Sequence, residues 1–213
     1  MKKLLLATAF LGVTLLQVHA GTSHIDFSLG LLSNSSGVAL SDGSLIQIIA
    51  APTGSSFANP TATNFLGGSS DEYIVYSGAF DSSTSGTPGS EIFSVNIDLT
   101  TFPVAGDALV VRWYPSLTTS SSAPGFTTYG QFGYPDNPSL LDSNNTWLTP
   151  SAGNSGSYSF ITSSLGGSYP DSKGFASHTI TPVPEPSSSI AIVALCATVV
   201  AIRHRRRIAQ AVR

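Results

Sequence analysis

Cysteine and charge are both scarce in this chain. Of its 213 residues, one is a cysteine, Cys196, and only 10% are charged. A lone cysteine cannot form a disulfide within the chain, so stability must come from packing. Residues 21–181 also lack a thiol nucleophile, which excludes cysteine-based catalysis there.

Basic residues are almost absent from the middle of the chain. Seven of the nine lysines and arginines lie at the two ends, in residues 2–3 and 203–213. Residues 21–181 keep only Arg112 and Lys173 against eleven acidic residues, a net charge of −9. Such a charge repels phosphate backbones and anionic lipid headgroups, so we exclude nucleic acid as a partner.

Motifs for nucleophilic catalysis are missing as well. No G-x-S-x-G elbow occurs, although serine is abundant. His24 and His178 are the histidines of residues 21–181, one near each end, and they meet only if the terminal strands pair. Two histidines without a third ligand make a poor zinc site. We therefore expect ordinary strand or surface histidines, no catalytic residue and no cofactor.

Paired carboxylates are the remaining catalytic candidate, because two acids at the right separation cleave glycosides. Asp71 and Glu72 are sequence neighbours, so in a strand they point to opposite faces. Pairs such as Asp98 with Asp107 or with Glu91 depend on the fold and stay open. For most of these acids we expect solvated surface charge.

The first twenty residues have the pattern of a secretory signal peptide. A basic start, Met1–Lys3, precedes an apolar run over 4–16, and Val18-His19-Ala20 offers a cleavage site after Ala20. The Sec translocon and signal peptidase are then the first partners. The alternative is an uncut signal anchor.

The last thirty residues combine a proline-rich linker, an apolar run and a basic end. Pro184, Glu185 and Pro186 favour an extended, accessible backbone. The apolar run over 187–202 reaches about 24 Å as a helix, slightly short for a membrane span, and snorkelling flanks compensate for the difference. The basic end is a cytoplasmic charge lock of four arginines: Arg203, Arg205, Arg206 and Arg207. These arginines argue against the alternative, a buried core helix.

These three parts, in this order over 183–207, resemble the PEP-CTERM sorting signal of exported bacterial proteins. The run departs slightly from the common pattern, since it is brief and rich in alanine and valine. The resemblance implies recognition by an exosortase, a membrane-embedded cysteine peptidase, near Pro184–Pro186. It also implies transient anchoring in the inner membrane of a bacterium that makes extracellular polysaccharide, and then placement on the surface or outside the cell.

The chain therefore divides into a signal peptide (1–20), an exported domain (21–181) and a sorting tail (182–213). Within the exported domain, residues 91–99 alternate strictly, with Phe93, Val95 and Ile97 on one face of a predicted strand. Ala108–Tyr114 repeats the pattern, with Leu109, Val111 and Trp113 predicted to point inward and Val110 and Arg112 outward.

A hairpin is predicted near residue 42. Gly37–Ser41 and Ser44–Ala50 flank Asp42-Gly43, a pair typical of type I′ turns. Further strands are expected at His24–Leu32, Glu72–Ser77, Thr127–Gly133, Ser157–Thr162 and Gly174–Ile180. Many short strands with glycine-, serine- and proline-rich connections and no helical period predict an all-β fold, an antiparallel β-sandwich or jelly roll.

Two kinds of ligand site are open in the sequence. Tyr129, Phe132 and Tyr134 are candidates for stacking on a sugar, with core packing as the alternative. Asp142–Thr146 places oxygen ligands at alternating positions, but Trp147 and Gly153 replace the glycine and glutamate of an EF-hand. A looser structural Ca²⁺ site is the alternative to an Asx-rich turn.

We expect a non-enzymatic structural or adhesive protein of the cell surface or extracellular matrix, acting on the cell's own exopolysaccharide. The alternative is a secreted carbohydrate-active enzyme that uses two carboxylates.

Overall fold

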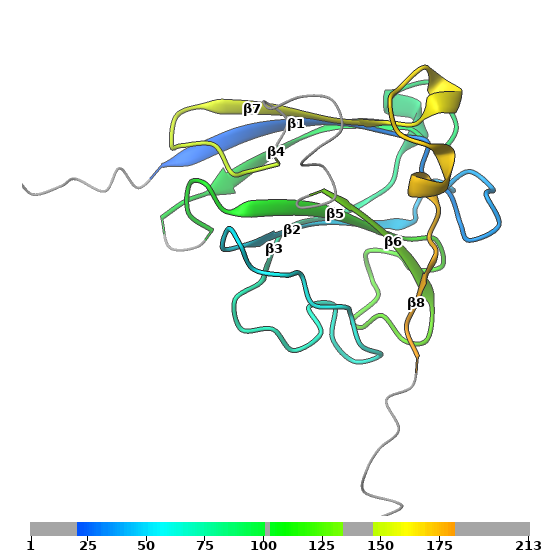
Figure 1. Cartoon of the computed structure of the whole chain (residues 1–213), viewed down its shortest axis with the longest axis horizontal. Coiled ribbons are helices and arrows are strands. Elements are labelled where there is room, and N and C mark those ends of the chain that lie inside the picture. Colours follow the sequence, from blue (N-terminus) through cyan, green and yellow to red (C-terminus); the bar gives the residue numbers. More distant parts are fainter. Residues whose placement is uncertain (1–20, 101–102, 134–146, 182–213) are drawn as a thin grey trace, which may run out of the picture.

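Alternating apolar and polar residues produce two facing β-sheets in this chain (Figure 1). The computed structural model describes residues 21–100, 103–133 and 147–181. The strands are Thr22–Gly30 (β1), Leu45–Ala51 (β2), Tyr73–Ala79 (β3), Glu91–Asp98 (β4), Ala108–Tyr114 (β5), Thr128–Gly133 (β6), Ser155–Ile161 (β7) and His178–Thr179 (β8). The all-β prediction is confirmed.

Helical structure in these residues is limited to three short 3-10 turns, η1 (Ser82–Thr84), η2 (Ser163–Leu165) and η3 (Asp171–Gly174). Across the described ranges, no helix has the length and apolar character needed to cross a membrane. The span predicted over 187–202 lies outside these ranges.

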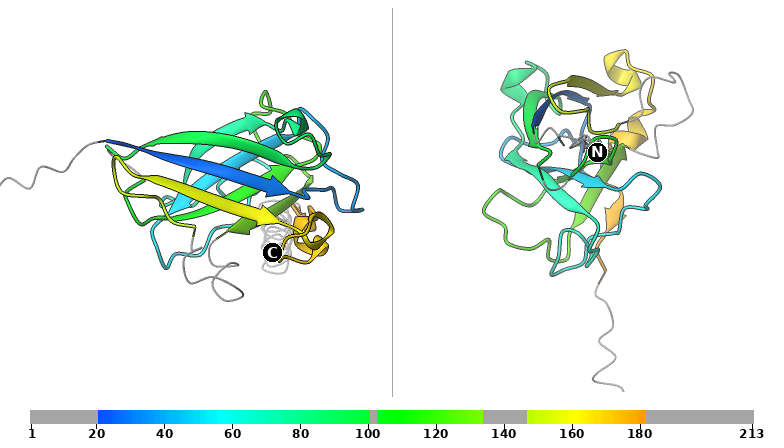
Figure 2. Two further views of the ribbon diagram at one scale, coloured as in Figure 1. Left: turned by 90° about the horizontal axis from the view of Figure 1, so that it is seen from above. Right: turned by 90° about the vertical axis from the view of Figure 1, so that its left-hand side faces the viewer.

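The sheets have the strand orders β4-β1-β7 and β3-β2-β5-β6-β8. Seen from above, the three-stranded layer lies over the five-stranded one (Figure 2). The larger sheet is antiparallel throughout, but β7 pairs with β1 in parallel, with Phe27 opposite Tyr158. The prediction of an antiparallel sandwich or jelly roll is therefore wrong for this pair. A parallel pair needs a long crossover. Here the chain forms most strands of the five-stranded sheet after β1 and before it returns as β7.

Strand β4 confirms the period-two prediction. Val95 and Ile97 are buried, whereas Ser94, Asn96 and Asp98 are exposed. Strand β5 has the predicted bounds, but both of its faces are buried. Val110 and Arg112 point away from the inter-sheet core as predicted, yet neither reaches solvent.

The predicted hairpin at Asp42-Gly43 is wrong. Among the described residues only glycines have positive φ, including Gly43 at 86°, whereas a type I′ turn needs positive φ at both central positions. Ala39 pairs instead with Ser33, and β2 pairs with β3 and β5. The preceding segment turns back on itself because Asn34 Oδ1 accepts hydrogen bonds from two backbone N–H groups of its own loop.

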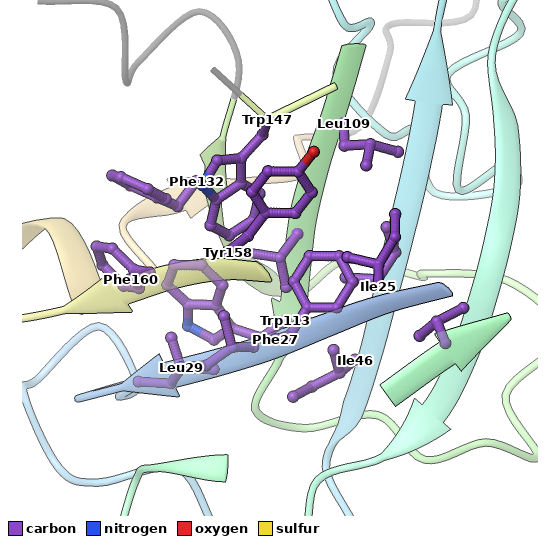
Figure 3. Close-up of a cluster of buried hydrophobic side chains, with 14 of the residues drawn as sticks. Ile25, Phe27, Leu29, Ile46, Leu109, Trp113, Phe132, Trp147, Tyr158 and Phe160 are labelled. Atoms are coloured by element: carbon purple, nitrogen blue, oxygen red, sulfur yellow. The ribbon is translucent and has the colours of Figure 1, made fainter. Parts of the chain in front are cut away.

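The core between the sheets is rich in aromatic rings (Figure 3). Phe27 of β1 stacks on Phe93 and meets Trp147 edge-on, with ring centroids 5.2 and 5.5 Å apart. Trp113 of β5, in the facing sheet, stacks on Phe160 of β7, with ring centroids 6.3 Å apart. Such pairs add to the stabilisation that area burial already provides.

A second, smaller apolar cluster lies on the other side of the five-stranded sheet. It consists of Leu45, Tyr114, Tyr129 and Ile180, with Phe65 of the β2–β3 connection packed against it. This connection, residues 52–72, covers the outer face of the sheet, opposite the three-stranded layer (Figure 1). It explains why the outward residues of β5 are buried, and it forms one wall of the candidate site.

Candidate functional site

A pocket opens where the β2–β3 connection meets the last strand. Its volume is about 290 Å³, and its lining residues are Asn59, Pro60, Thr61, Tyr129, His178, Thr179 and Thr181. The size is close to the lower end of the range for small-molecule sites. Hydroxyl, amide, imidazole and phenol groups line it, and none of the lining residues carries a carboxylate.

Tyr129 is the aromatic centre of this pocket. Its partner across the β6–β8 pair is His178, and the two rings stack with centroids 5.0 Å apart and planes 24° from parallel. The phenol hydroxyl donates to Asn59 Oδ1 at 2.9 Å. Burial raises the pKa of Tyr129, so the hydroxyl stays protonated at neutral pH and serves as a donor.

Asn59 is held in place by a buried charged pair. Arg112 of β5 is fully buried, and its Nη2 donates to Ala58 O at 2.6 Å. Glu72 Oε1 accepts a hydrogen bond from Ala58 N, and Glu72 Oε2 lies 4.0 Å from Arg112 Nη1. Both polar groups of the Ala58 backbone are therefore bound by this pair, which places the next residue, Asn59, within hydrogen-bond distance of the Tyr129 hydroxyl.

Arg112 also anchors more distant parts of the wall. Its Nη1 donates to Phe65 O at 3.0 Å, and its Nε donates to Gln131 Oε1 at 2.6 Å. The guanidinium carbon lies 5.9 Å from the centre of the Tyr129 ring. Burial lowers the pKa of Arg112 below its ordinary value, and the nearby Tyr114 and Glu72 oppose that shift. One arginine thus joins β5, β6 and the covering connection beneath the pocket.

The three residues predicted to stack on a sugar have different surroundings. Phe132 is buried in the inter-sheet core, stacked on Phe160 at 3.9 Å and edge-on to Trp147 at 5.5 Å. No face of its ring is left for a ligand, so that expectation is corrected. Tyr129 lines the pocket, although little of it is exposed. Tyr134 lies outside the described residues.

His24 and His178 do not come together, because β1 and β8 belong to different sheets. His24 Nδ1 lies 2.8 Å from Asn96 Oδ1, and Nε2 lies 3.1 Å from Asp26 Oδ1. Ser94 Oγ donates to the same carboxylate oxygen at 2.5 Å. The hydrogen bond to Asn96 and the charge of Asp26 raise the pKa of His24. In a catalytic triad the imidazole lies between the serine hydroxyl and the carboxylate. Here Ser94 bonds the carboxylate of Asp26 instead, so these residues do not form a triad.

The carboxylate pairs considered from sequence are not brought onto one surface. Asp71 is exposed and Glu72 is buried, and both precede β3 rather than lying in a strand. In β4, Glu91 is buried whereas Asp98 is exposed. Asp107 is buried and accepts a hydrogen bond from Val104 N at 2.8 Å.

Among the described acidic residues, Glu91 has the pKa that departs furthest from its ordinary value. Burial raises its pKa to about 7, the Asp81 backbone N–H opposes the shift, and the charges of Asp81 and Asp42 add to it. A raised pKa next to other carboxylates is typical of a general acid. The side chain is only 4% exposed, however, so it does not face a substrate in this conformation.

Replacing Glu91 with glutamine is expected to remove a pH dependence of stability. The folded-state pKa of about 7 exceeds the ordinary 4.5, so the folded protein keeps a proton that the unfolded chain releases between these values. Stability therefore falls as pH rises through this window. At about 1.4 kcal/mol per pKa unit, the difference between 4.5 and about 7 is equivalent to about 3 kcal/mol, which the variant should gain over wild type at pH 8.

Urea midpoints from pH 4 to pH 8 measure this effect. Asp98→Asn, an exposed change in the same strand, is the control: the Thr100 N–H lowers the pKa of Asp98, so it cannot produce a loss with rising pH. Equal slopes for wild type and Glu91→Gln would contradict the prediction.

Within the described ranges, no group of three or more histidine, cysteine, aspartate or glutamate side chains is placed to hold a metal ion. The candidate calcium segment Asp142–Thr146 lies outside these ranges. So do the signal cleavage site at Ala20, the motif Pro184–Pro186 and the charge lock over 203–207.

Comparisons with known proteins find no matching family model, no matching curated protein and no matching solved structure.

Sequence reasoning missed most of the pocket. Asn59, Thr61, Thr179 and Thr181 carry no motif, and they meet only because residues 58–59 are bound to β5 and β8 pairs with β6. His178 was considered only as a possible partner of His24. The one usable signal is Tyr129, which belongs to the aromatic residues concentrated between Trp113 and Trp147.

Proposed function

We propose that this chain is a non-enzymatic protein of a bacterial cell surface or extracellular matrix that binds a sugar unit of an extracellular polysaccharide. The observation that carries the proposal is the pocket between Asn59 and His178, with Tyr129 as its aromatic centre. Sugars offer hydroxyl groups, which match the amide and hydroxyl groups of the lining, and an apolar ring face, which matches the exposed His178 imidazole because Tyr129 itself is only 2% exposed. The pocket volume of about 290 Å³ suits a ligand of about one sugar ring.

The two chain ends support the proposed location. The basic and apolar pattern of residues 1–20 favours export, and the PEP-CTERM resemblance of residues 183–207 favours sorting by an exosortase and a temporary hold in the inner membrane. Adhesion to polysaccharide outside the cell agrees with the net charge of −9 over residues 21–181, which disfavours nucleic acids and anionic lipid.

A secreted carbohydrate-active enzyme is the second candidate. The observation in its favour is the pKa of Glu91, raised to about 7 beside Asp81 and Asp42. Against it, Glu91 is buried and belongs to the three-stranded sheet, whereas the pocket is built on β6 and β8. We therefore favour binding without turnover.

Replacing Asn59 or His178 with alanine is expected to weaken polysaccharide binding about tenfold, the equivalent of one lost hydrogen bond or ring contact. Affinity electrophoresis of residues 21–181 in gels containing candidate polysaccharides measures the effect. This fragment contains both sheets and both apolar clusters.

His24→Ala is the matched control, because His24 is exposed on the other sheet. Equal retention of the His24→Ala and His178→Ala proteins would contradict the proposed site. Release of reducing sugar that disappears in Glu91→Gln would favour the enzyme instead.

A further inference from the structure

The last strand forms one wall of the pocket. His178, Thr179 and Thr181 line the pocket from β8 and the residues after it, whereas Asn59, Pro60 and Thr61 line it from the β2–β3 connection. A ligand that contacts both walls binds only while β8 is docked on β6. Ligand binding and β8 docking are therefore thermodynamically linked, and each favours the other.

Strand β8 is joined to the domain by its pairing with β6, by the stack of His178 on Tyr129 and by the buried Ile180 just beyond it. Two residue pairs join it to β6, Thr128 with Thr179 and Tyr129 with His178. Just beyond the strand, Ile180 N donates to Thr127 O at 2.9 Å. Both residues of β8 are exposed, and short exposed elements at a sheet edge open at low free-energy cost. A bound ligand adds to these contacts and so raises the docked fraction.

The sorting motif follows this strand closely. Pro184 is three residues after Thr181, which lines the pocket. Three residues of chain reach at most about 10 Å, so a peptidase acting near Pro184–Pro186 works next to the pocket. A peptidase groove takes in chain on both sides of the bond that it cuts. Docking of β8 withholds residues 178–181 from that groove, and undocking releases them.

We propose that the pocket ligand regulates processing: a sugar bound between Asn59 and His178 holds β8 on β6 and slows the cut near Pro184–Pro186. This inference rests on the proposed sugar binding and sorting. In the cut itself, the peptidase thiol attacks a backbone carbonyl and the tail leaves as a free amine. Water or another nucleophile then releases the domain from the thioester. The pocket takes no part in that chemistry and changes only the access to the bond.

The consequence is a protein that stays anchored while it holds polysaccharide. Because the ligand binds the docked state alone, saturation at 100 times Kd shifts the docking equilibrium by about 100-fold. The rate of processing then reports on whether the pocket is filled.

The test is a pulse–chase of the full chain in spheroplasts that carry the exosortase, with and without oligosaccharides from the producing strain's exopolysaccharide. We expect the oligosaccharides to slow wild-type processing by about threefold or more. A variant with about ten Gly/Ser residues inserted between Thr181 and Pro182 should bind the oligosaccharides normally and be cut quickly with or without them, since a flexible linker separates cut and pocket. Replacing Pro184–Pro186 with alanines provides the uncut reference.

Ile180→Pro is the second variant, because proline cannot donate the hydrogen bond that Ile180 N makes to Thr127 O. It should be cut faster than wild type and should not respond to the oligosaccharides. Oligosaccharide binding without any change in wild-type processing would overturn this inference and leave the proposed function intact. Failure of the wild-type protein to bind any oligosaccharide would overturn both this inference and the proposed function. If oligosaccharides slow processing of the insertion variant as much as that of wild type, the inference alone is overturned.

Discussion

Replacing Arg112 with alanine is expected to destabilise the domain by about 3–5 kcal/mol, because the buried Glu72 loses its countercharge. The guanidinium also makes three hydrogen bonds: those to Ala58 O and Phe65 O join the β2–β3 connection to the sheet, and the one to Gln131 Oε1 joins β5 to β6. Urea unfolding of residues 21–181 measures the loss as a lower midpoint. Sugar binding should fall as well, because Asn59 is no longer held within hydrogen-bond distance of the Tyr129 hydroxyl.

Lys173→Ala is the matched control, since Lys173 is the other basic residue of the exported domain and is exposed. Its effect should stay within about 0.5 kcal/mol. The double variant Arg112→Met with Glu72→Met should recover part of the stability, because an apolar pair avoids an uncompensated buried charge. It should not recover sugar binding. An Arg112→Ala protein as stable as Lys173→Ala would show that the pair does not hold the connection.

Replacing Gly130 with alanine is expected to destabilise the domain by about 3 kcal/mol through overpacking. Gly130 of β6 lies opposite Trp113 of β5, and a Cβ on Gly130 would meet the indole at 2.0 Å from Cε2. Trp113 is fully buried, and its Nε1 donates to Ser33 O at 3.1 Å. The ring cannot move aside without losing this bond and its packing.

Gly156→Ala is the control on another strand, where an added Cβ would meet only the side-chain ends of Pro150 and Tyr158, at 3.0 and 3.2 Å. The difference between the two urea midpoints isolates the clash. Adding Trp113→Phe to Gly130→Ala should reduce the penalty for the alanine, since a smaller ring leaves room for it. Equal midpoints for the two single variants would mean that the indole can relocate at little cost.

Period-two alternation predicted the strands well where one face is buried and the other is wet. Strand β4 is the clearest example, with Val95 and Ile97 inside and Asn96 outside. Strand β5 has the predicted bounds and Arg112 points outward as predicted, but no part of it reaches solvent. Local pattern identifies the face of a strand, whereas burial of that face depends on what covers it, here a connection more than forty residues earlier in the chain.

Pairing was the least predictable feature. Asp42-Gly43 is typical of a hairpin turn, yet Gly43 N donates to Phe80 O and Asp42 Oδ1 accepts from Ser82 N. The turn is stabilised by contacts with a distant segment. The parallel pairing of β7 with β1 could not be predicted from the sequence either, because strand order depends on the energies of all pairings together.

By itself, the amino-acid sequence determined the all-β class and the faces of several strands, because side-chain alternation is a local property of the backbone. The tertiary structure alone decided which strands are neighbours, that Phe132 belongs to the core, and that Asn59 and His178 both contact Tyr129 and line one pocket. The pocket arises from contacts between residues about 120 positions apart, and only packing of the whole domain specifies contacts over such separations.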